Sequence, residues 1–89
     1  MGERTQVFCR WTDVLLGHVY EEWPDFKPIR GRLDNALREM HAGECIYPVR
    51  LSCSHMTGRC RVTDGRHRIM AAHLLGREKL LVEETWYDE

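Results

Sequence analysis

The sequence predicts an α+β fold in which a small mixed sheet packs against two main helices. Two segments, 47–53 and 60–63, are short and carry the alternating or β-branched residues that are typical of strands. Two others read as helices: 33–40 carries apolar residues at helical spacing, and 69–75 is mostly apolar and contains neither Gly nor Pro. With 89 residues and 43% hydrophobic content, the chain is expected to form a single domain, 1–89, around one thin core.

The N-terminal third is predicted to contain one strand and little other regular structure. Residues 5–11 alternate loosely between polar and apolar side chains, which favours a strand. Thr12 and Asp13 can cap a short helical turn, and Gly17 is expected to end it. The segment 18–31 mixes Pro, Gly and aromatic residues, a composition typical of an ordered loop packed by its own side chains. No long element is expected there.

The first main helix is predicted from an apolar face with members at positions i, i+3, i+4 and i+7. These residues are Leu33, Ala36, Leu37 and Met40. Asp34 favours a helix start near the beginning of this pattern, and Gly43 is expected to stop the helix.

The two predicted strands form a hairpin, and a sharp turn at Asp64 and Gly65 leads from it into the second main helix. Gly76 is expected to supply the C-cap of that helix. A short last strand is predicted over 79–82 because its apolar run follows directly. Residues 85–89 are expected to form a short acidic tail that frays.

The formal net charge is −1, but the charges are unevenly distributed. The segment 50–77 contains six Arg and a single acid, Asp64. This distribution predicts a local anion site rather than a surface that coats long nucleic acids. No apolar run approaches the roughly 20 residues of a membrane span, and no apolar stretch follows Arg4 as it would in a secretory signal. We therefore expect a cytoplasmic location and no membrane partner.

The segment from Asp64 to Arg68 combines the features of a phosphate-binding turn. A strand followed by Gly65 and a helix leaves free backbone N–H groups at the helix N-terminus, where the helix dipole also attracts an anion. Arg66, His67 and Arg68 fall in the first helical turn, where the macrodipole disfavours each positive charge by about 0.3–1 kcal/mol. A bound phosphate would offset this cost, and Gly65 would let it approach closely. The alternative is that Asp64 caps the helix while the basic side chains point into water.

The run from Arg61 to Gly76, with the apolar segment 80–82 after it, resembles a known family. It is similar to the Asp-Gly-His-His-Arg box of stand-alone ParB-like domains, and the preceding helix and strand fall where that family has them. The resemblance to ParB/sulfiredoxin-like domains covers roughly 33–84. It implies a ParB/sulfiredoxin-like fold with nucleotide phosphates over the turn, and a nucleoside di- or triphosphate with Mg²⁺ as cofactor. The implied cofactor-binding residues are Asp64, Gly65, Arg66, His67 and Arg68.

Two kinds of relative differ from this sequence at the turn. In sulfiredoxins a catalytic Cys precedes the His-Arg pair, and Arg66 occupies that place here, so reduction of sulfinic acids is not expected. Partition proteins of the ParB type carry a Gly-Glu-Arg-Arg-x-Arg box and bind CTP. This chain has Arg66 in place of the Glu and Met70 in place of the last Arg, so CTP is not favoured over other nucleotides.

The free serine kinases of the same fold have Asp-Gly-His-Thr-Arg at this turn. The chain matches that turn at Asp64, Gly65 and Arg68. The resemblance implies a carboxylate base in the N-terminal loop, and Glu21 or Glu22 lies in about the right place. A carboxylate that faces a γ-phosphate could orient or deprotonate a hydroxyl or a water, with His67 as the next candidate. The alternative is a solvated pair of Glu residues next to Trp23.

Cys53, His55 and Cys60 flank the predicted hairpin loop, so two thiols and an imidazole could approach one another there. Three ligands fall short of the four of a closed structural zinc site, and His41 or Cys45 could complete it only through the fold. A cross-strand disulfide is disfavoured by a reducing compartment. The sequence therefore favours unpaired cysteines and no metal site.

The leading functional hypothesis is a ParB-like domain that binds a nucleotide or a phosphorylated small molecule, with NTP hydrolysis or phosphoryl transfer as its activity. One alternative is a nucleic-acid-binding module or nuclease, in which the same turn holds a backbone phosphate. The other is a catalytically inactive protein-interaction domain. The oligomeric state is not indicated by the sequence.

Overall fold

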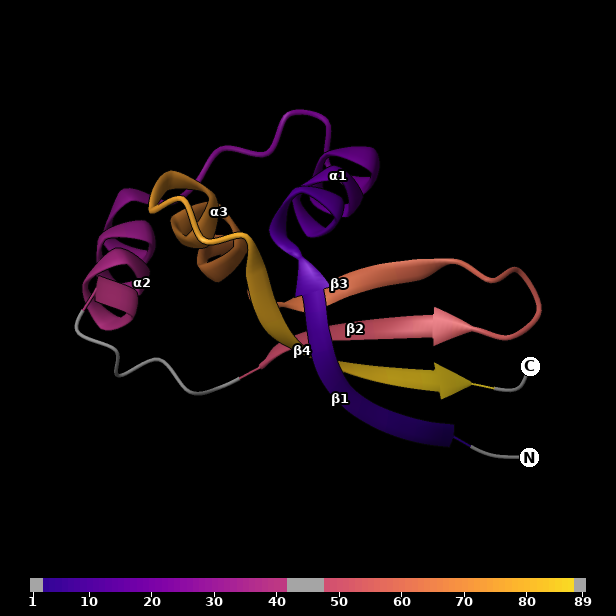
Figure 1. Cartoon of the computed structure of the whole chain (residues 1–89). Helices are drawn as coiled ribbons and strands as arrows, with labels where there is room; N and C mark the ends of the chain where they lie inside the picture. The colour runs from indigo at the N-terminus through magenta and orange to yellow at the C-terminus, as the bar shows by residue number, and fades with distance from the viewer. Residues whose placement is uncertain (1–2, 42–47, 88–89) are drawn as a thin grey trace.

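The computed structural model describes residues 3–41 and 48–87 as three helices and one four-stranded sheet (Figure 1). In chain order the elements are β1 (Glu3–Trp11), α1 (Thr12–Glu22), α2 (Arg30–His41), β2 (Val49–Ser54), β3 (Cys60–Asp64), α3 (Arg66–Leu74) and β4 (Lys79–Tyr87). Gly43, Cys45 and Tyr47, which the sequence analysis singled out, lie outside the described residues. Among the described helices, none is long and apolar enough to cross a bilayer.

The sheet is mixed, as predicted, and has the strand order β1-β4-β2-β3. β4 therefore lies in the interior of the sheet, where it pairs antiparallel with β1 and parallel with β2. β2 and β3 form the predicted antiparallel hairpin. β3 and α3 together make the crossover that parallel pairing of β2 and β4 requires. The α+β class is thus confirmed, with a third helix where the sequence analysis predicted only a short helical turn.

All three helices lie on one face of the sheet (Figure 1). The main core lies between this face and the helices α1 and α3. Its buried residues are Leu15, Val19, Val49, Leu51, Cys53, Val62, Ile69 and Val82. α2 packs on α3 rather than on the sheet, and a second small cluster fills that contact. Its buried residues are Ala36, Met40, Ala71 and Ala72. This arrangement places α3 between the sheet and α2.

The opposite face of the sheet carries the alternating apolar residues that predicted β1. Val7 is 57% exposed and Trp11 is 53% exposed. Across the β1–β4 pair, Leu81 is 43% exposed on the same face. The alternation therefore predicted the strand correctly, but its apolar side lies on the outer face of the sheet and not in the core.

α1 was predicted only as a short helical turn, but it runs through Gly17 instead of ending there. Leu15 and Val19, one helical turn apart, are fully buried in the core, whereas Gly17 lies on the exposed side. Burial of this apolar pair outweighs the propensity cost of about 1 kcal/mol for a helical Gly. The expected loop is confined to 23–29, and α2 begins at Arg30, earlier than Asp34 suggested.

β4 is also longer than the short strand predicted for 79–82. It extends to Tyr87 because its second half has a partner on each side. Thr85, for example, is opposite Thr5 of β1 and Ser52 of β2. The expectation of a fraying tail is therefore wrong for the part of that segment within β4.

The end of α3 follows the prediction closely. Gly76 has a φ of +72° and donates its N–H to the carbonyl of His73, and Arg77 donates its N–H to the carbonyl of Ala72. These two bonds form a Schellman motif, in which Gly avoids the cost that a side chain pays at positive φ. A local signal in the sequence was sufficient to predict this helix end.

Replacing Gly17 by Ala tests the course of α1. A Cβ at Gly17 would have no heavy atom within 4 Å, so the variant should raise the free energy of unfolding by about 0.5–1 kcal/mol through helix propensity alone. Urea denaturation measures the change. Gly76→Ala is the matched control, because its surroundings are equally open but its positive φ should make Ala destabilising. Loss of stability in Gly17→Ala would mean that α1 does end at Gly17.

Candidate phosphate-binding site

The predicted turn leads from β3 into α3 through a left-handed Gly65, whose φ is +109°. A Cβ at this position would lie 3.0 Å from Cγ2 of Val49, so the backbone conformation and the close packing both require Gly. The N-cap residue is Gly65, which has no side chain, and no side-chain hydrogen bond from the described residues caps the N-terminus of α3. Its first N–H groups therefore lack the capping partner that helices usually have, as the anion-site hypothesis requires.

A cavity of about 200 Å³ opens at this helix end. It is lined by Arg32, Thr63, Asp64, Gly65, Arg66, His67 and Arg68. The structure thus brings together all five residues that the resemblance implied for cofactor binding. Arg32 is an addition from α2, and no local pattern in the sequence could have revealed it, because only the packing of α2 on α3 brings it to the turn.

Arg68 lies beneath the turn, and its side chain is only 15% exposed. Its guanidinium donates one hydrogen bond to the carbonyl of Pro48 at 3.1 Å and another to Oδ2 of Asp64 at 3.0 Å. These bonds tie the first turn of α3 to the start of β2. Asp64 consequently holds Arg68 and does not cap the helix, so the capping alternative is wrong.

Arg66 does not point simply into water. Its guanidinium lies over the ring of Trp23, 4.3 Å from the ring centroid, and 6.0 Å from that of Phe26. Both aromatic residues belong to the loop between α1 and α2. A cation over an aromatic face is stabilised by about 0.5–1 kcal/mol at an exposed site. This contact holds Arg66 between the turn and the aromatic loop.

His67 fastens the same loop to the turn. Its Nε2 accepts a hydrogen bond from the backbone N–H of Ile29 at 3.0 Å, and its ring meets that of Phe26 edge-on. Burial lowers the pKa of His67 below its usual value, and the positive charges of Arg32 and Arg66 lower it further. The imidazole is therefore neutral at pH 7 and its lone pair is already used. A role for His67 as a general base would require this hydrogen bond to break.

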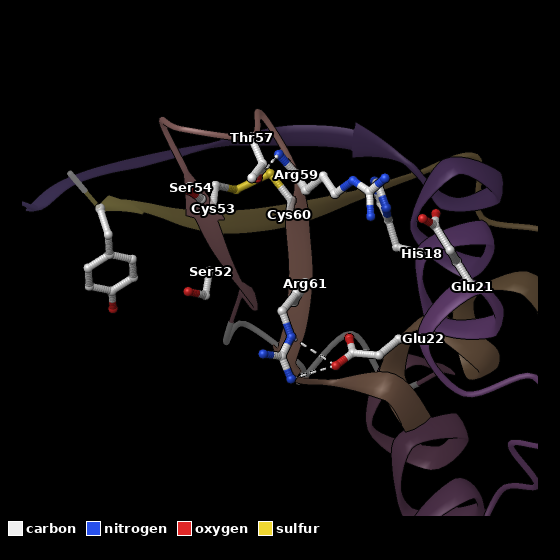
Figure 2. A pocket seen from close by; sticks show the side chains of 11 residues that line it. His18, Glu21, Glu22, Ser52, Cys53, Ser54, Thr57, Arg59, Cys60 and Arg61 are labelled. Carbon is white, nitrogen blue, oxygen red and sulfur yellow. Dashed lines mark hydrogen bonds and ion pairs between the residues drawn. A yellow bond between two sulfur atoms is a disulfide. The ribbon is translucent and has the colours of Figure 1, made fainter. Parts of the chain in front are cut away.

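Glu21 and Glu22 lie on α1 rather than on a loop, and neither lines the cavity at the turn. Oε1 of Glu22 is 2.7 Å from Nη2 of Arg61, an ion pair that Figure 2 shows beside the pocket wall. Glu22 also lines a second cavity, of about 370 Å³, together with Trp23 and Arg66. Arg66 thus lines both this second cavity and the cavity at the turn. Glu21 lines neither of these two cavities.

The cysteine prediction is corrected by the structure, because Cys53 and Cys60 form a disulfide. The two residues are directly opposite in the β2–β3 hairpin, with their Cα atoms 4.1 Å apart. Ser54, the next residue of β2, donates its N–H to the carbonyl of Arg59, which makes the cysteines a non-hydrogen-bonded pair, where side chains lie closest. His55 instead packs on Trp86. Both thiols needed for the zinc alternative are consumed by the bond.

One solved structure, described as a Pnob8-like ParB-N domain, is similar to the chain with a TM-score of 0.64. The match covers 99% of this chain and 32% of that chain at 12% sequence identity. The likeness extends over the N-terminal third as well as the segment that carried the sequence resemblance. At this identity it confirms a ParB-like fold and nothing further, and the chain spans about a third of the length of that protein. No family model and no curated protein matches the chain.

The burial of His67 beside the charges of Arg32 and Arg66 predicts how stability responds to pH. The pKa of His67 is lowered in the folded state from an ordinary value of 6.5, so the unfolded chain binds more protons between these two values. The contribution of neutral His67 is fully present above pH 6.5 and is lost as the pH falls through the folded pKa. Urea unfolding of the parent and of His67→Gln at several pH values measures the difference. Equal pH slopes for the two proteins would contradict the prediction.

Proposed function

We propose that this chain, which has the fold of a ParB-N domain, binds a nucleotide or another phosphorylated small molecule at the turn from β3 to α3. The observation that carries the proposal is the uncapped N-terminus of α3, which opens onto a cavity lined by basic side chains from two helices. The N–H groups of a first helical turn and the helix dipole together favour a phosphate at such a position. Gly65 allows the ligand to approach the backbone.

Arg32 is the side chain best suited to supply the anion-binding cation. Arg68 already donates to Pro48 and Asp64, and Arg66 lies over Trp23. Arg32 is exposed and lines the cavity, so its guanidinium can donate two parallel hydrogen bonds to a phosphate. The binding roles that the resemblance gave to five residues therefore divide between backbone groups at the turn and Arg32.

The neighbouring cavity offers room for the rest of a nucleotide. The cavity at the turn, at about 200 Å³, accommodates phosphates but not a base and ribose as well. The cavity of about 370 Å³ that shares Arg66 is lined by Trp23 and Phe26. Aromatic faces stack on nucleobases with little dependence on sequence. A nucleotide with its phosphates at α3 and its base against the aromatic loop would span both cavities.

Mg²⁺ would accompany the nucleotide and not occupy a protein site of its own. Asp64 is the only carboxylate among the described residues that line the cavity at the turn, and Arg68 holds it. Magnesium usually binds through one or two carboxylates together with substrate phosphates. The residues at the turn therefore do not fit a preformed metal site, and no step of the proposal depends on one.

Replacing Arg32 by Ala tests the binding site. The loss of a charge-assisted hydrogen bond should weaken binding by about 1.5–3 kcal/mol, or roughly 10- to 150-fold. Calorimetry with ATP, ADP, CTP and GTP, each with magnesium, measures the affinity. Arg38→Ala is the matched control, because Arg38 lies on the same helix, is exposed and does not line the cavity. Equal affinities of the parent and Arg32→Ala would contradict the proposed site.

Titrations with DNA beside the nucleotides distinguish the small-molecule site from the nucleic-acid module and the protein-interaction domain. Binding of single-stranded or duplex DNA with a steep dependence on salt would favour a nucleic-acid module, because each neutralised phosphate releases counterions. Nucleotide binding without any response to DNA would favour the small-molecule site. Failure of both ligand classes would leave the protein-interaction domain as the better account.

Separate substitutions of Glu21 and Glu22 test whether either residue takes part in catalysis. Glu22 lines the cavity that shares Arg66 with the turn, whereas Glu21 does not. If the chain hydrolyses or transfers phosphate, Glu22→Gln should lower the rate by about 10²–10⁴-fold, the usual share of general base catalysis, with binding nearly intact. Glu21→Gln is the matched control and should keep the parent rate. Equal rates for the parent and Glu22→Gln would assign the base elsewhere.

A further inference from the structure

A separate cavity, of about 430 Å³, lies along the β2–β3 hairpin and gives access to the disulfide (Figure 2). Both cysteines line it, but the two residues are buried to different extents. Cys53 is only 1% exposed and belongs to the core, whereas Cys60 is half-buried. An external reagent that enters the cavity therefore meets Cys60 more readily than Cys53. This asymmetry fixes which sulfur an incoming thiol would attack.

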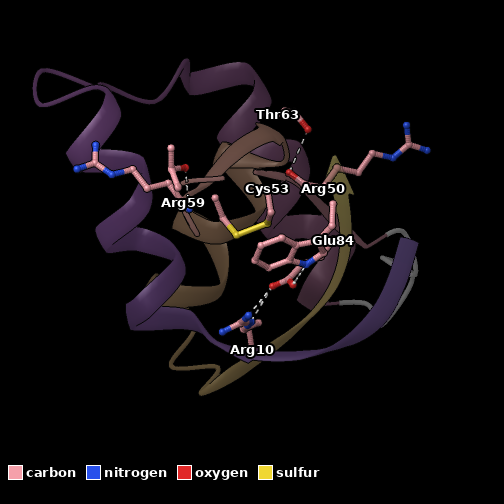
Figure 3. The surroundings of a disulfide bond; sticks show 9 residues. Arg10, Arg50, Cys53, Arg59, Thr63 and Glu84 are labelled. Carbon is pink, nitrogen blue, oxygen red and sulfur yellow. Dashed lines mark hydrogen bonds and ion pairs between the residues drawn. A yellow bond between two sulfur atoms is a disulfide. The ribbon is translucent and has the colours of Figure 1, made fainter. Parts of the chain in front are cut away.

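A buried carboxylate lies beside the same disulfide. Glu84 is 2% exposed, and one of its oxygens lies within 4.8 Å of both sulfur atoms. Arg10 donates two hydrogen bonds to Oε2 and Trp86 donates one to Oε1 (Figure 3). A carboxylate offers about four lone-pair sites, so these bonds leave room for one more partner.

We propose that Cys53 and Cys60 are a redox-active pair that exchanges with a small acidic thiol at Cys60, with Glu84 as the proton carrier for Cys53. The thiolate of the small molecule attacks Sγ of Cys60, the Cys53–Cys60 bond breaks, and a mixed disulfide forms at Cys60. The electron pair of the broken bond stays on Cys53. The proton that the small thiol gave up on ionising balances this charge, and Cys53 takes it up by way of the carboxyl group of Glu84. In the reverse direction Glu84 accepts that proton as Cys53 attacks the mixed disulfide and releases the thiol.

The position of Glu84 gives this step a physical basis. The thiolate is the reactive form of a cysteine, and an apolar site disfavours it. Cys53 lies in the core, so its proton needs an acceptor that is already there. Among the described residues, Glu84 is the acid that approaches both sulfurs. Arg10 and Trp86 hold its carboxylate in place.

The cavity wall carries the acids Glu21 and Glu22 as well as basic residues, and Arg59 is the basic residue that favours an acidic thiol. Arg59 reaches across the opening toward His18 of α1 in Figure 2, and both residues line the cavity. Arg61 is paired with Glu22, so Arg59 is better placed to bind a ligand carboxylate. A peptide thiol with free carboxylates, such as glutathione, fits this combination of size and charge.

Trapping experiments test the direction of attack. In the full chain with Cys9→Ser and Cys45→Ser, glutathione disulfide should modify Cys60 in the Cys53→Ser variant at least about tenfold faster than Cys53 in the Cys60→Ser variant. Intact mass spectrometry under native conditions measures both rates, and circular dichroism checks the fold. Equal rates would overturn the assignment of Cys60.

The parent protein provides a test that does not depend on the folding of these variants. Its disulfide should be reduced by millimolar glutathione at neutral pH without unfolding. Arg59→Ala should slow this reaction with glutathione but leave the reaction with uncharged 2-mercaptoethanol at the parent rate. A disulfide that yields to neither thiol until the chain unfolds is purely structural and would overturn the proposal.

Glu84→Gln tests the proton carrier. Starting from the mixed disulfide at Cys60, glutathione release by Cys53 should be about 10²–10⁴-fold slower than in the parent near neutral pH. The deficit should shrink at high pH, where Cys53 loses its proton to solvent. A merely structural change would slow the reaction by a similar factor at every pH, and that result, or an unchanged rate, would remove Glu84 from the step.

Discussion

The helices cover only one face of the sheet, and most features of the molecule follow from this constraint. The main apolar layer between the helices and the sheet is thin, and only the small α2–α3 cluster adds to it, so α1 and α3 both have to reach the sheet. α3 can do so only if the chain leaves β3 and turns at once onto the sheet. Gly65 makes that turn possible, and Arg68 fixes it by joining Pro48 to Asp64. The candidate site is therefore a product of how α3 is packed.

The three basic residues of the first turn of α3 have different environments. Arg68 is compensated by Asp64, Arg66 lies over an aromatic ring, and His67 is neutral with its lone pair engaged. Contacts within the protein therefore offset much of the unfavourable interaction with the helix dipole. Positive charge in the first turn is thus a weaker indication of a ligand than the sequence suggested. The uncapped N–H groups of α3 and the exposed Arg32 are the stronger indication of a ligand.

Local signals were sufficient for part of this structure. The apolar face of α2, the hairpin, the turn at Gly65 and the cap at Gly76 were all predictable, because each depends on residues close together in the chain. The passage of α1 through Gly17, the full length of β4, the approach of Arg32 and the disulfide were not. The first three depend on contacts between distant segments, which no local pattern records. The disulfide joins residues only seven positions apart in the predicted hairpin, and it was rejected because a reducing compartment was assumed. The resemblance to ParB-like domains identified the fold but not the contacts of the individual basic residues.

The pairing of the first and last strands also determines how the molecule responds to mechanical force. Glu3 lies opposite Tyr87, and Trp11 lies opposite Lys79 at the other end of the pair. Tension that separates Glu3 from Tyr87 would load the β1–β4 hydrogen bonds one after another, since they run perpendicular to the strands. The disulfide joins β2 to β3 and gives this pair no covalent support. β1 would therefore separate from β4 at low force, before the load reaches the turn at Gly65.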